Sequence, residues 1–412
     1  MKKIAIIGGG ASGLMAALTL KKELKNNIDV EIYERNNKIG KKILMSGNGK
    51  GNISNFFVSE KNYNNPIFVK PIIDNFKVDS LIKEFFEYGL SLVKDDAGRM
   101  YPQSDSSNSI LDTLRMQLDN YKVKIYSDIY VESFEFKDNV FWIGNKKYDY
   151  LVLAAGSVAA NKEKKNRIQD SVEKIGHSFT KFYPSLSQIL TNYTNIKSLS
   201  GIRVKALAKI AIAGKIIKEE YGEILFKDNA LSGIVVLNLS AVLARISQEK
   251  VIDDAEVILD LLPKLSIQEV FDILLYNIKS NPWKTIDQLL LGQFNKMISQ
   301  SLLKDSGITD FKKRVDSLSA NEIKMIVNVI KNWRFKVSIS NDLNNCQVIS
   351  GGVDISDIES PSLESKKAKN LYFCGEFLNI DGECGGFNLH FAFASGYNAA
   401  QSIVKKINSN EK

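Results

Sequence analysis

The sequence contains few of the side chains on which enzymes without a cofactor most often depend. Among its 412 residues there are only two histidines and three cysteines. So few histidines provide neither a Ser-His-Asp arrangement nor a set of metal ligands, and we expect no metal centre. The cysteines, Cys346, Cys374 and Cys384, form neither an even set nor a CxxC pair. This favours a reducing, cytoplasmic location over a disulfide framework.

Long hydrophobic runs are also missing. No stretch of about 18 consecutive apolar residues occurs, so we expect no membrane segment. Lys and Arg outnumber Asp and Glu by 55 to 47, a net charge of +8, but the basic residues are spread along the chain. A positive charge of this size, distributed along the chain, is typical of a solvated surface, so we expect no nucleic-acid partner. The length predicts roughly two or three domains.

What the sequence does contain is the pattern of a dinucleotide-binding βαβ unit in its first forty residues. An apolar run over 2–7 predicts a buried strand, and the run from Leu14 predicts a helix. Between them lie the glycines of the motif, of which Gly8 permits a tight turn and Gly10 a close approach to a pyrophosphate. Gly13 allows the helix to pack closely on the strand.

A second predicted strand, over 29–33, ends on Glu34. A carboxylate at this place accepts hydrogen bonds from ribose hydroxyls and repels a 2′-phosphate, so it favours FAD or NAD over NADP. The following segment, 35–55, is rich in Gly, Asn and Lys and does not read as a regular element. We expect it to be an extended loop that contacts a polyanionic ligand.

The predicted secondary structure changes twice in the middle of the chain. Strand-like runs over 122–126, 129–136 and 140–143 predict a β-meander, and a buried strand then ends at Ala155-Gly156. Beyond residue 188 we expect an inserted domain of strands and then of helices, after which glycine-rich sequence returns.

The C-terminal part carries the second informative stretch. A strand over 371–373 leads to Gly375-Glu376, and the segment 381–388 (Asp-Gly-Glu-Cys-Gly-Gly-Phe-Asn) precedes a long helix. The positive end of that helix could stabilise negative charge on the pyrimidine side of a reduced flavin.

Taken in order, Glu34, the loop Ser46–Asn52, the segment Gly98–Pro102 and the stretch Cys374–Asn388 resemble one family. It is the aminoacetone oxidase-like family of FAD-binding proteins, which are NAD(P)/FAD-dependent oxidoreductases. The resemblance runs from Lys3 to the C-terminal helix.

The resemblance implies an α/β fold with a discontinuous, Rossmann-like FAD-binding domain over 1–187 and 346–412. It also implies an inserted β-domain over 188–240 and 333–345, and a helical subdomain over 241–332.

Position by position, the resemblance also implies the residues that bind FAD. They are Gly8, Gly10, Ala11, Ser12, Gly13, Glu34 and Arg35 for the ADP half; Lys42, Ser46, Gly47, Asn48, Gly49 and Asn52 for the pyrophosphate, ribityl chain or ring; Val131 for the adenine; Ala155, Gly156, Gly375 and Glu376 for the turns beside the ribityl chain; and Asp381, Gly385, Gly386, Phe387 and Asn388 for the isoalloxazine.

Three departures from the family pattern concern the substrate more than the FAD. Lys50-Gly51 stands where the family commonly has Arg-Cys, so no thiol is offered there. Lys227-Asp228 replaces a usual Thr-His, and Asn161–Asn166 replaces a glycine-rich stretch.

We predict an FAD-dependent oxidoreductase that moves a hydride through flavin N5, with NADH, NADPH or a small organic substrate as donor. No second GxGxxG motif predicts a separate nicotinamide domain. An amine oxidase that uses oxygen and an enone or ketone reductase both remain open. A different class is also open: a flavin-containing RNA- or protein-binding module, whose RNA affinity would depend steeply on salt.

Three residues are candidates for catalysis. His390 follows the Gly-Gly-Phe-Asn turn at a position where the family commonly has an amide, and it either faces the flavin edge or belongs to the core. Arg99 and Tyr101 would bind substrate or brace the flavin loop. The other histidine, His177, is expected to be structural or on the surface.

Overall fold

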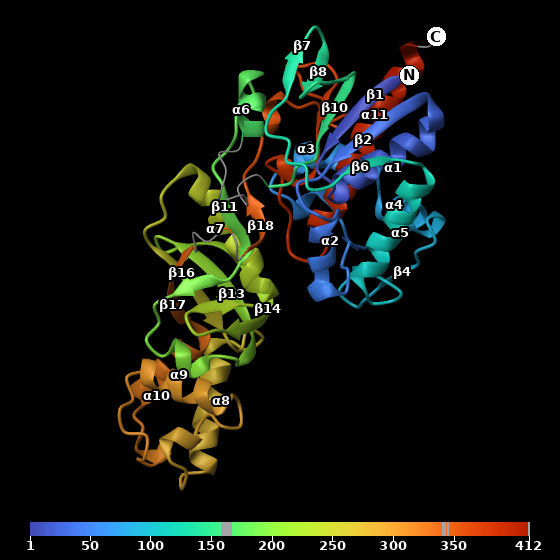
Figure 1. Ribbon diagram of the computed structural model, residues 1–412. Coiled ribbons are helices and arrows are strands. Elements are labelled where there is room, and N and C mark those ends of the chain that lie inside the picture. The colour runs from blue at the N-terminus through green and yellow to red at the C-terminus, as the bar shows by residue number, and fades with distance from the viewer. Residues whose placement is uncertain (158–166, 340–342, 344–345, 411–412) are drawn as a thin grey trace. The chain divides into compact units, whose positions relative to one another are not determined.

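The computed structural model describes residues 1–157, 167–339, 343 and 346–410, and the chain divides into two compact units (Figure 1). Unit 1 comprises Met1–Tyr183 and Ile349–Lys412, and unit 2 comprises Pro184–Val348. The chain therefore leaves unit 1 and returns to it. The fold class predicted from the sequence, a discontinuous Rossmann-like unit with inserted strands and helices, is confirmed.

A parallel sheet of five strands, in the order β19-β10-β1-β2-β6, forms the centre of unit 1 within the described residues. Its strands are β1 (Lys2–Ile7), β2 (Ile28–Tyr33), β6 (Lys124–Tyr126), β10 (Tyr150–Leu153) and β19 (Leu371–Phe373). Residues Ile4 to Ile7 of β1 are at most 5% exposed. Such near-continuous apolar runs are typical of strands covered on both faces. The strand order reverses beside β1, where open parallel sheets bind their ligands.

The helices α1 (Ala11–Leu24) and α11 (Phe387–Asn410) come from opposite ends of the sequence and pack against each other. Gly396 of α11 allows this close contact, because a Cβ built there would lie 2.1 Å from the carbonyl oxygen of Ser12. The other α-helices described in unit 1 are α2 (Lys41–Met45), α3 (Pro66–Asn75), α4 (Val78–Glu87), α5 (Ser107–Asn120) and α6 (Arg167–Lys174).

Two small antiparallel sheets also occur among the described residues of unit 1. One joins β3 (Ser54–Asn55), β5 (Arg99–Pro102) and β4 (Leu92–Lys94), and the other is the meander β7 (Glu135–Lys137), β8 (Val140–Ile143) and β9 (Lys146–Tyr148). The predicted meander started too early. The run over 122–126 supplies β6 of the parallel sheet instead, and 129–133 is not strand. Period-2 patterns cannot show which sheet a strand joins.

Unit 2 is built on a closed barrel with the strand order β12-β15-β14-β13-β16-β17. The barrel strands are β12 (Ile189–Thr191), β13 (Arg203–Ile212), β14 (Lys215–Phe226), β15 (Ala230–Ser232), β16 (Ala255–Asp260) and β17 (Trp333–Ile339). Where the chain passes between the units, β11 (Tyr183–Ser187) and β18 (Cys346–Ser350) pair with each other. Phe226, Trp333 and Phe335 are fully buried and in ring contact.

The prediction of helices throughout 241–332 was wrong at one place. Helices α7 (Ile234–Glu249), α8 (Ile267–Ser280), α9 (Lys296–Asp305) and α10 (Ala320–Lys331) are present, but β16 interrupts them. This six-residue segment pairs with both β13 and β17 and closes the barrel. A short apolar run fits a helix or a strand equally well, and only pairing partners distant in sequence decide between them.

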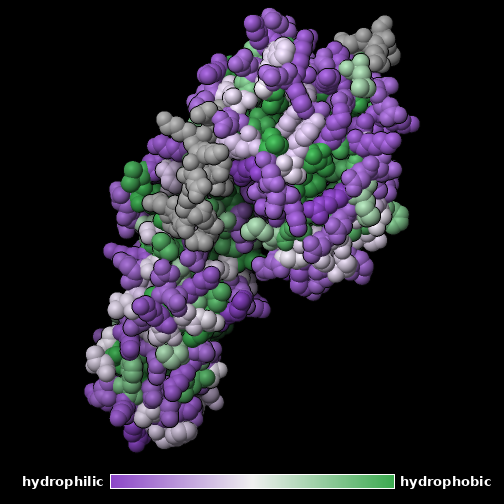
Figure 2. All heavy atoms as spheres, in the orientation of Figure 1, coloured by the Kyte–Doolittle hydropathy of each residue, from purple (hydrophilic) through white to green (hydrophobic). Residues whose placement is uncertain are grey.

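Hydrophilic side chains cover most of the face drawn in Figure 2, with hydrophobic side chains in small groups between them. Among the described residues, every helix is too short or too polar to span a lipid bilayer.

Candidate cofactor site

The glycine turn after β1 lies at the carboxyl edge of the parallel sheet, beside the end of β10. Gly8 has a φ of +110°, and a Cβ there would lie 2.1 Å from the carbonyl oxygen of Ala154. Gly13 is equally restricted, since its Cβ would lie 2.0 Å from the oxygen of Gly8. Only glycine fits at these positions, because the neighbouring atoms belong to the backbone and cannot turn away.

Gly10 differs from these two glycines, because a Cβ built on it would meet no atom within 4 Å. It precedes α1, whose first intrahelical bond runs from the Leu14 N–H to the Gly10 oxygen over 2.9 Å. Within the described part of the chain, the N–H groups of Ala11 and Ser12 have no backbone acceptor. Open space in front of unpaired N–H groups at a helix start is suited to a phosphate.

Glu34 follows β2 at the same edge of the sheet and is 7% exposed. Its carboxylate accepts hydrogen bonds from the backbone N–H groups of Gly9 and Asn36, each over 2.8 Å. A carboxylate has about four lone-pair sites, so ribose hydroxyls could still donate to it. The next residue, Arg35, is exposed.

The segment 35–55, which we call the basic loop, contains more regular structure than the sequence indicated. It forms the short helix α2 and a 3₁₀ turn over Ser46–Gly49, in which Gly47 and Asn48 both have a φ of +55°. Lys42 of α2 forms an ion pair with Glu376, which follows Gly375 at the end of β19. The loop is thereby joined to the edge of the parallel sheet.

Asparagine side chains join this loop to the turn before α11. The amide of Asn52 is oriented so that both of its ends are paired. It donates to the backbone carbonyl oxygen of Ser54 over 2.9 Å and accepts from the Gly386 N–H over 3.2 Å. Asn55 donates to the Gly385 oxygen over 3.1 Å. Gly386 must be glycine, because its φ is +100° and its Cβ would lie 2.2 Å from the Ser54 oxygen.

Three further asparagines extend this join. Asn62 donates to the Glu383 carboxylate over 3.0 Å, and Asn64 accepts from the Asp381 N–H over 3.2 Å. Asn388 accepts from the Gly382 N–H over 2.8 Å. The sequence analysis missed Asn55, Asn62 and Asn64, although the frequency of Asn in the segment 48–65 was a visible signal. Amide side chains bond backbone groups where no regular ladder is present.

His390 is not at the edge of a ligand site. It is 0% exposed, and its Nδ1 lies 2.9 Å from the Ser54 hydroxyl. A side chain without any exposed surface has no face to offer a cofactor or substrate, so of the two roles left open for His390 the structure favours the core. Burial lowers its pKa to about 4, so the ring is neutral at pH 7.

Arg99 and Tyr101 lie on β5 beside the basic loop. Arg99 donates from Nε to Asp95 over 2.7 Å, which makes it a brace of the β4–β5 turn. The ring of Tyr101 lies against Gly47, 3.1 Å from where a Cβ would be. Tyr101 is half-buried, and burial raises the pKa of its phenol, so it is protonated at neutral pH.

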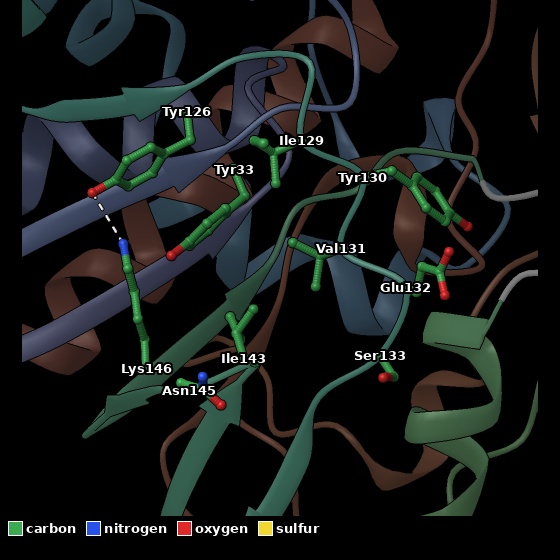
Figure 3. Close-up of a pocket in the computed structure, with 11 residues that line it drawn as sticks. Tyr33, Tyr126, Ile129, Tyr130, Val131, Glu132, Ser133, Ile143, Asn145 and Lys146 are labelled. Carbon is green, nitrogen blue, oxygen red and sulfur yellow. Dashed lines mark hydrogen bonds between the residues drawn. The ribbon is translucent and has the colours of Figure 1, made fainter.

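Val131 lines a pocket of about 550 Å³ in unit 1 (Figure 3). The segment before it is attached to the end of β2, because the Ile129 N–H donates to the backbone carbonyl oxygen of Glu34 over 3.0 Å. Val131 itself is 7% exposed, and it follows this attached segment by two residues. The lining residues are Tyr33, Tyr126, Ile129, Tyr130, Val131, Glu132, Ser133, Ile143, Gly144, Asn145 and Lys146.

Three of the lining residues, Tyr33, Tyr126 and Lys146, belong to a polar cluster around Glu31 of β2. Its carboxylate accepts from Tyr148 over 2.5 Å, from Lys146 over 2.9 Å and from Tyr33 over 3.2 Å. Burial opposes ionisation, but the hydrogen bonds from Tyr148 and Lys146 lower the pKa of Glu31 to about 2. Lys146 also donates a hydrogen bond to the Tyr126 hydroxyl over 3.0 Å, which Figure 3 marks. Its Nζ lies 4.1 Å from the ring centroid of Tyr126. The charge of Glu31 is therefore paired with that of Lys146 inside the cluster.

The remaining predicted residues lie near the carboxyl edge of the sheet or in the turn before α11. Gly156 has open space beside it, whereas a Cβ on Gly375 would lie 2.7 Å from the Ser12 hydroxyl. Asp381 is 1% exposed and accepts from the Ser350 hydroxyl over 3.2 Å. Phe387 is buried, and Ala155 and Asn388 are half-buried. The departure at Asn161–Asn166 lies outside the described residues.

The parallel sheet, the open glycine turn and Glu34 together define a dinucleotide-binding unit of the Rossmann type. The chain belongs to the HI0933-like family, whose profile, described as "HI0933-like protein Rossmann domain", matches residues 2–402.

Curated relatives match almost the whole chain. A 3-dehydro-bile acid delta(4,6)-reductase from Clostridium scindens is 29% identical and covers 98% of this chain and 100% of its own. A ribosomal RNA dihydrouridine synthase from Haemophilus influenzae is 26% identical and covers 97% of this chain and 98% of its own.

Among solved structures, the chain is similar to a 3-ketosteroid delta1-dehydrogenase from Sterolibacterium denitrificans in complex with 1,4-androstadiene-3,17-dione. The identity is 12%, the TM-score is 0.44, and the match covers 98% of this chain and 100% of the other.

Proposed function

We propose that the protein uses FAD to reduce a carbon–carbon double bond conjugated to a carbonyl group in a small organic substrate. The observation that carries this proposal is that two relatives, each matching at least 97% of the chain, have names that describe the same operation. A 3-dehydro bile acid with 4,6-unsaturation is a dienone. Dihydrouridine is uridine whose carbon–carbon double bond, conjugated to a ring carbonyl, has been reduced. The bond that gains hydrogen is of one type in both.

The residues around the glycine turn would hold the ADP half of FAD. The N–H groups of Ala11 and Ser12 would bind the pyrophosphate in the space left by Gly10, and Glu34 would accept hydrogen bonds from the ribose. Backbone groups of Val131 would contact the adenine.

The basic loop and the turn before α11 would hold the flavin half. The N–H groups at the start of α11 would stabilise negative charge on the isoalloxazine, and Asn52 and Asn55 would keep that turn in place. The bound flavin supplies a hydride from N5. The other proposed cofactor contacts are Gly8, Gly13, Arg35, Lys42, Ser46, Gly47, Asn48, Gly49, Ala155, Gly156, Gly375, Glu376, Asp381, Gly385, Gly386, Phe387 and Asn388.

Reduction of a double bond also requires a proton at the second carbon, and Tyr101 is the residue we propose for it. Its phenol is protonated at neutral pH and lies beside Gly47 of the loop. Arg99 is paired with Asp95 and would position the strand rather than transfer a proton. We expect NADH or NADPH to be the electron donor.

The first experiment is an anaerobic titration of the purified protein. A flavin spectrum that bleaches on addition of NADH or NADPH, and returns when a 3-oxo-4-ene or 3-oxo-4,6-diene steroid is added, would support the proposal. Tyr101→Phe should keep the flavin spectrum and slow the return about 100-fold, the order of magnitude for a lost general acid.

Three other outcomes would each overturn the proposal in its own way. Return of the colour only with uridine-containing RNA would make the substrate a nucleic acid. Bleaching by a primary amine such as aminoacetone, with return only in air, would make the protein an amine oxidase. A protein that cannot be loaded with FAD would have neither activity.

A further inference from the structure

The two histidines of the chain both lie in unit 1 and are built in the same way. His390 is 0% exposed and pairs with the Ser54 hydroxyl over 2.9 Å, and His177 is 3% exposed and pairs with the Ser365 hydroxyl over 2.7 Å. Among the described residues, the other ring nitrogen of His177 has no hydrogen-bond partner, and that of His390 faces only the backbone of Phe76. Burial lowers the pKa of both rings. The two histidines differ in the other contacts that their serine partners make.

The serine beside His177 caps a local turn. Ser365 accepts hydrogen bonds from the N–H groups of Lys367 and Ala368, over 3.0 and 2.9 Å, just before β19. The ring edge of His177 meets Phe373 at a centroid distance of 4.9 Å. His177 therefore belongs to the packing behind the sheet.

The serine beside His390 belongs to a closed circuit of contacts. The backbone carbonyl oxygen of Ser54 accepts from the Asn52 amide, whose other end accepts from the Gly386 N–H. The Gly386 oxygen accepts from the His390 N–H over 3.0 Å, which is a bond of the first turn of α11. The ring of His390 returns to Ser54. The circuit fixes the start of α11 against β3 through one side chain from each element.

We propose that His390, acting through Ser54, is a positioning residue that holds the start of α11 in the orientation required for FAD binding. This inference rests on the proposed cofactor site but concerns a link inside the protein. His390 is buried too deeply to touch the cofactor or to exchange protons with a substrate. Its neutral ring offers Nδ1 as a fixed partner for a hydroxyl that would otherwise rotate. The chain at Ser54 and the start of α11, which are distant in sequence, are thereby held in a fixed relative position.

The test compares three single variants of this pair, and the double variant of Ser54→Ala with His390→Leu, with a matched control. Ser54→Ala and His390→Leu each break the circuit, and His390→Gln restores a polar partner for Ser54. His177→Leu removes the other buried histidine without touching the circuit. The first readout is amide hydrogen exchange of segment 381–390 in protein without added FAD. The second is the dissociation constant and midpoint potential of FAD in loaded protein.

We expect Ser54→Ala and His390→Leu each to speed exchange in segment 381–390 and to weaken FAD binding, both by about 10-fold, the factor for one lost hydrogen bond. The double variant should add little to either single change, because both remove the same link. His390→Gln should stay within about 3-fold of the wild type. His177→Leu should lower the melting temperature but leave the exchange and the dissociation constant unchanged.

The inference is overturned if His390→Leu lowers the melting temperature as His177→Leu does and changes neither readout. If His390→Leu does not fold, Ser54→Ala and His390→Gln decide the matter, because both keep a residue of similar size. If the wild-type protein binds no FAD, the proposed function fails, and the exchange measurement still decides whether His390 positions the turn.

Discussion

The two long helices that meet in unit 1 both begin at a glycine turn, but the two turns are constrained by different things. At α1, Gly10 faces open space, so its small size serves whatever enters that space. At α11, Gly386 faces the carbonyl oxygen of Ser54 at 2.2 Å from its would-be Cβ, and its N–H is taken by Asn52. Under the proposed function a ligand requires the first glycine, whereas the protein's own backbone requires the second. Identical letters in a motif can therefore report on binding or on folding.

The largest effect should come from Gly386→Ala. The new Cβ would meet the backbone of Ser54, which cannot move aside, at a φ of +100° that alanine rarely adopts. We expect the free energy of unfolding to fall by about 4 kcal/mol, as measured by urea denaturation. Gly10→Ala is the matched control and should cost less than about 1 kcal/mol. Equal losses in the two variants would remove the distinction between the turns.

Acid should act on the α11 side of the comparison and not on α1, whose first turn contains no acidic residue and no histidine. The pKa of His390 falls from 6.5 to about 4 on folding, so between these values the unfolded chain binds more protons than the folded one. Stability is therefore lost as the pH falls from 6.5 towards 4, by up to about 3 kcal/mol.

Urea titrations at pH 7, 5.5 and 4 would measure this loss, and His390→Gln should flatten it. His177, whose pKa is also lowered, contributes a loss of the same sign. If His390→Gln left the pH dependence unchanged, the ring of His390 would not be the group that titrates.

Gly10→Ala should have its effect on binding instead. Its φ of −88° suits alanine, and no atom lies within 4 Å of the new Cβ, so the fold should be unaffected. The methyl group would occupy the space proposed for the pyrophosphate, and we expect the dissociation constant of FAD to rise about 10-fold, or about 1.4 kcal/mol. Equilibrium titration with FAD measures it. An unchanged constant would mean that the pyrophosphate lies elsewhere.

The smallest effect should come from Lys42→Ala, which breaks the ion pair between the basic loop and Glu376. The Lys42 side chain is 52% exposed, and such pairs contribute at most about 1 kcal/mol. Lys70→Ala, at the exposed pair with Asp74, is the control and should change the melting temperature as little. A clearly larger shift for Lys42→Ala would show that the pair helps to hold the two parts of the site together.

The sequence was sufficient for the features that depend on neighbours in the chain. The strand, turn and helix around Gly8 and Gly13 could be predicted because each residue's role is local or involves the next element. The discontinuity of unit 1 could be predicted because glycine-rich, ligand-type sequence returns after the insertion.

Features that depend on distant partners could not be predicted. The segment 255–260 becomes a strand because β13 and β17 pair with it, and nothing within six residues records those partners. The sequence left a ligand role and a core role open for His390, because the partner that decides between them, Ser54, is 336 positions away. The roles of Asn55, Asn62 and Asn64 are likewise set by a segment more than 300 positions further along the chain.

The asparagine join between the segments 52–64 and 381–388 has a consequence for how the protein is made. Its two halves leave the ribosome far apart in time: at about 5 to 20 residues per second, more than 300 residues take roughly 15 to 60 s. During that interval the N-terminal half of the join has no partner, whereas the barrel already has all of its strands by the time residue 339 is made. A newborn chain would therefore acquire its cofactor only as synthesis ends, and a prematurely released chain could contain a folded barrel and no flavin.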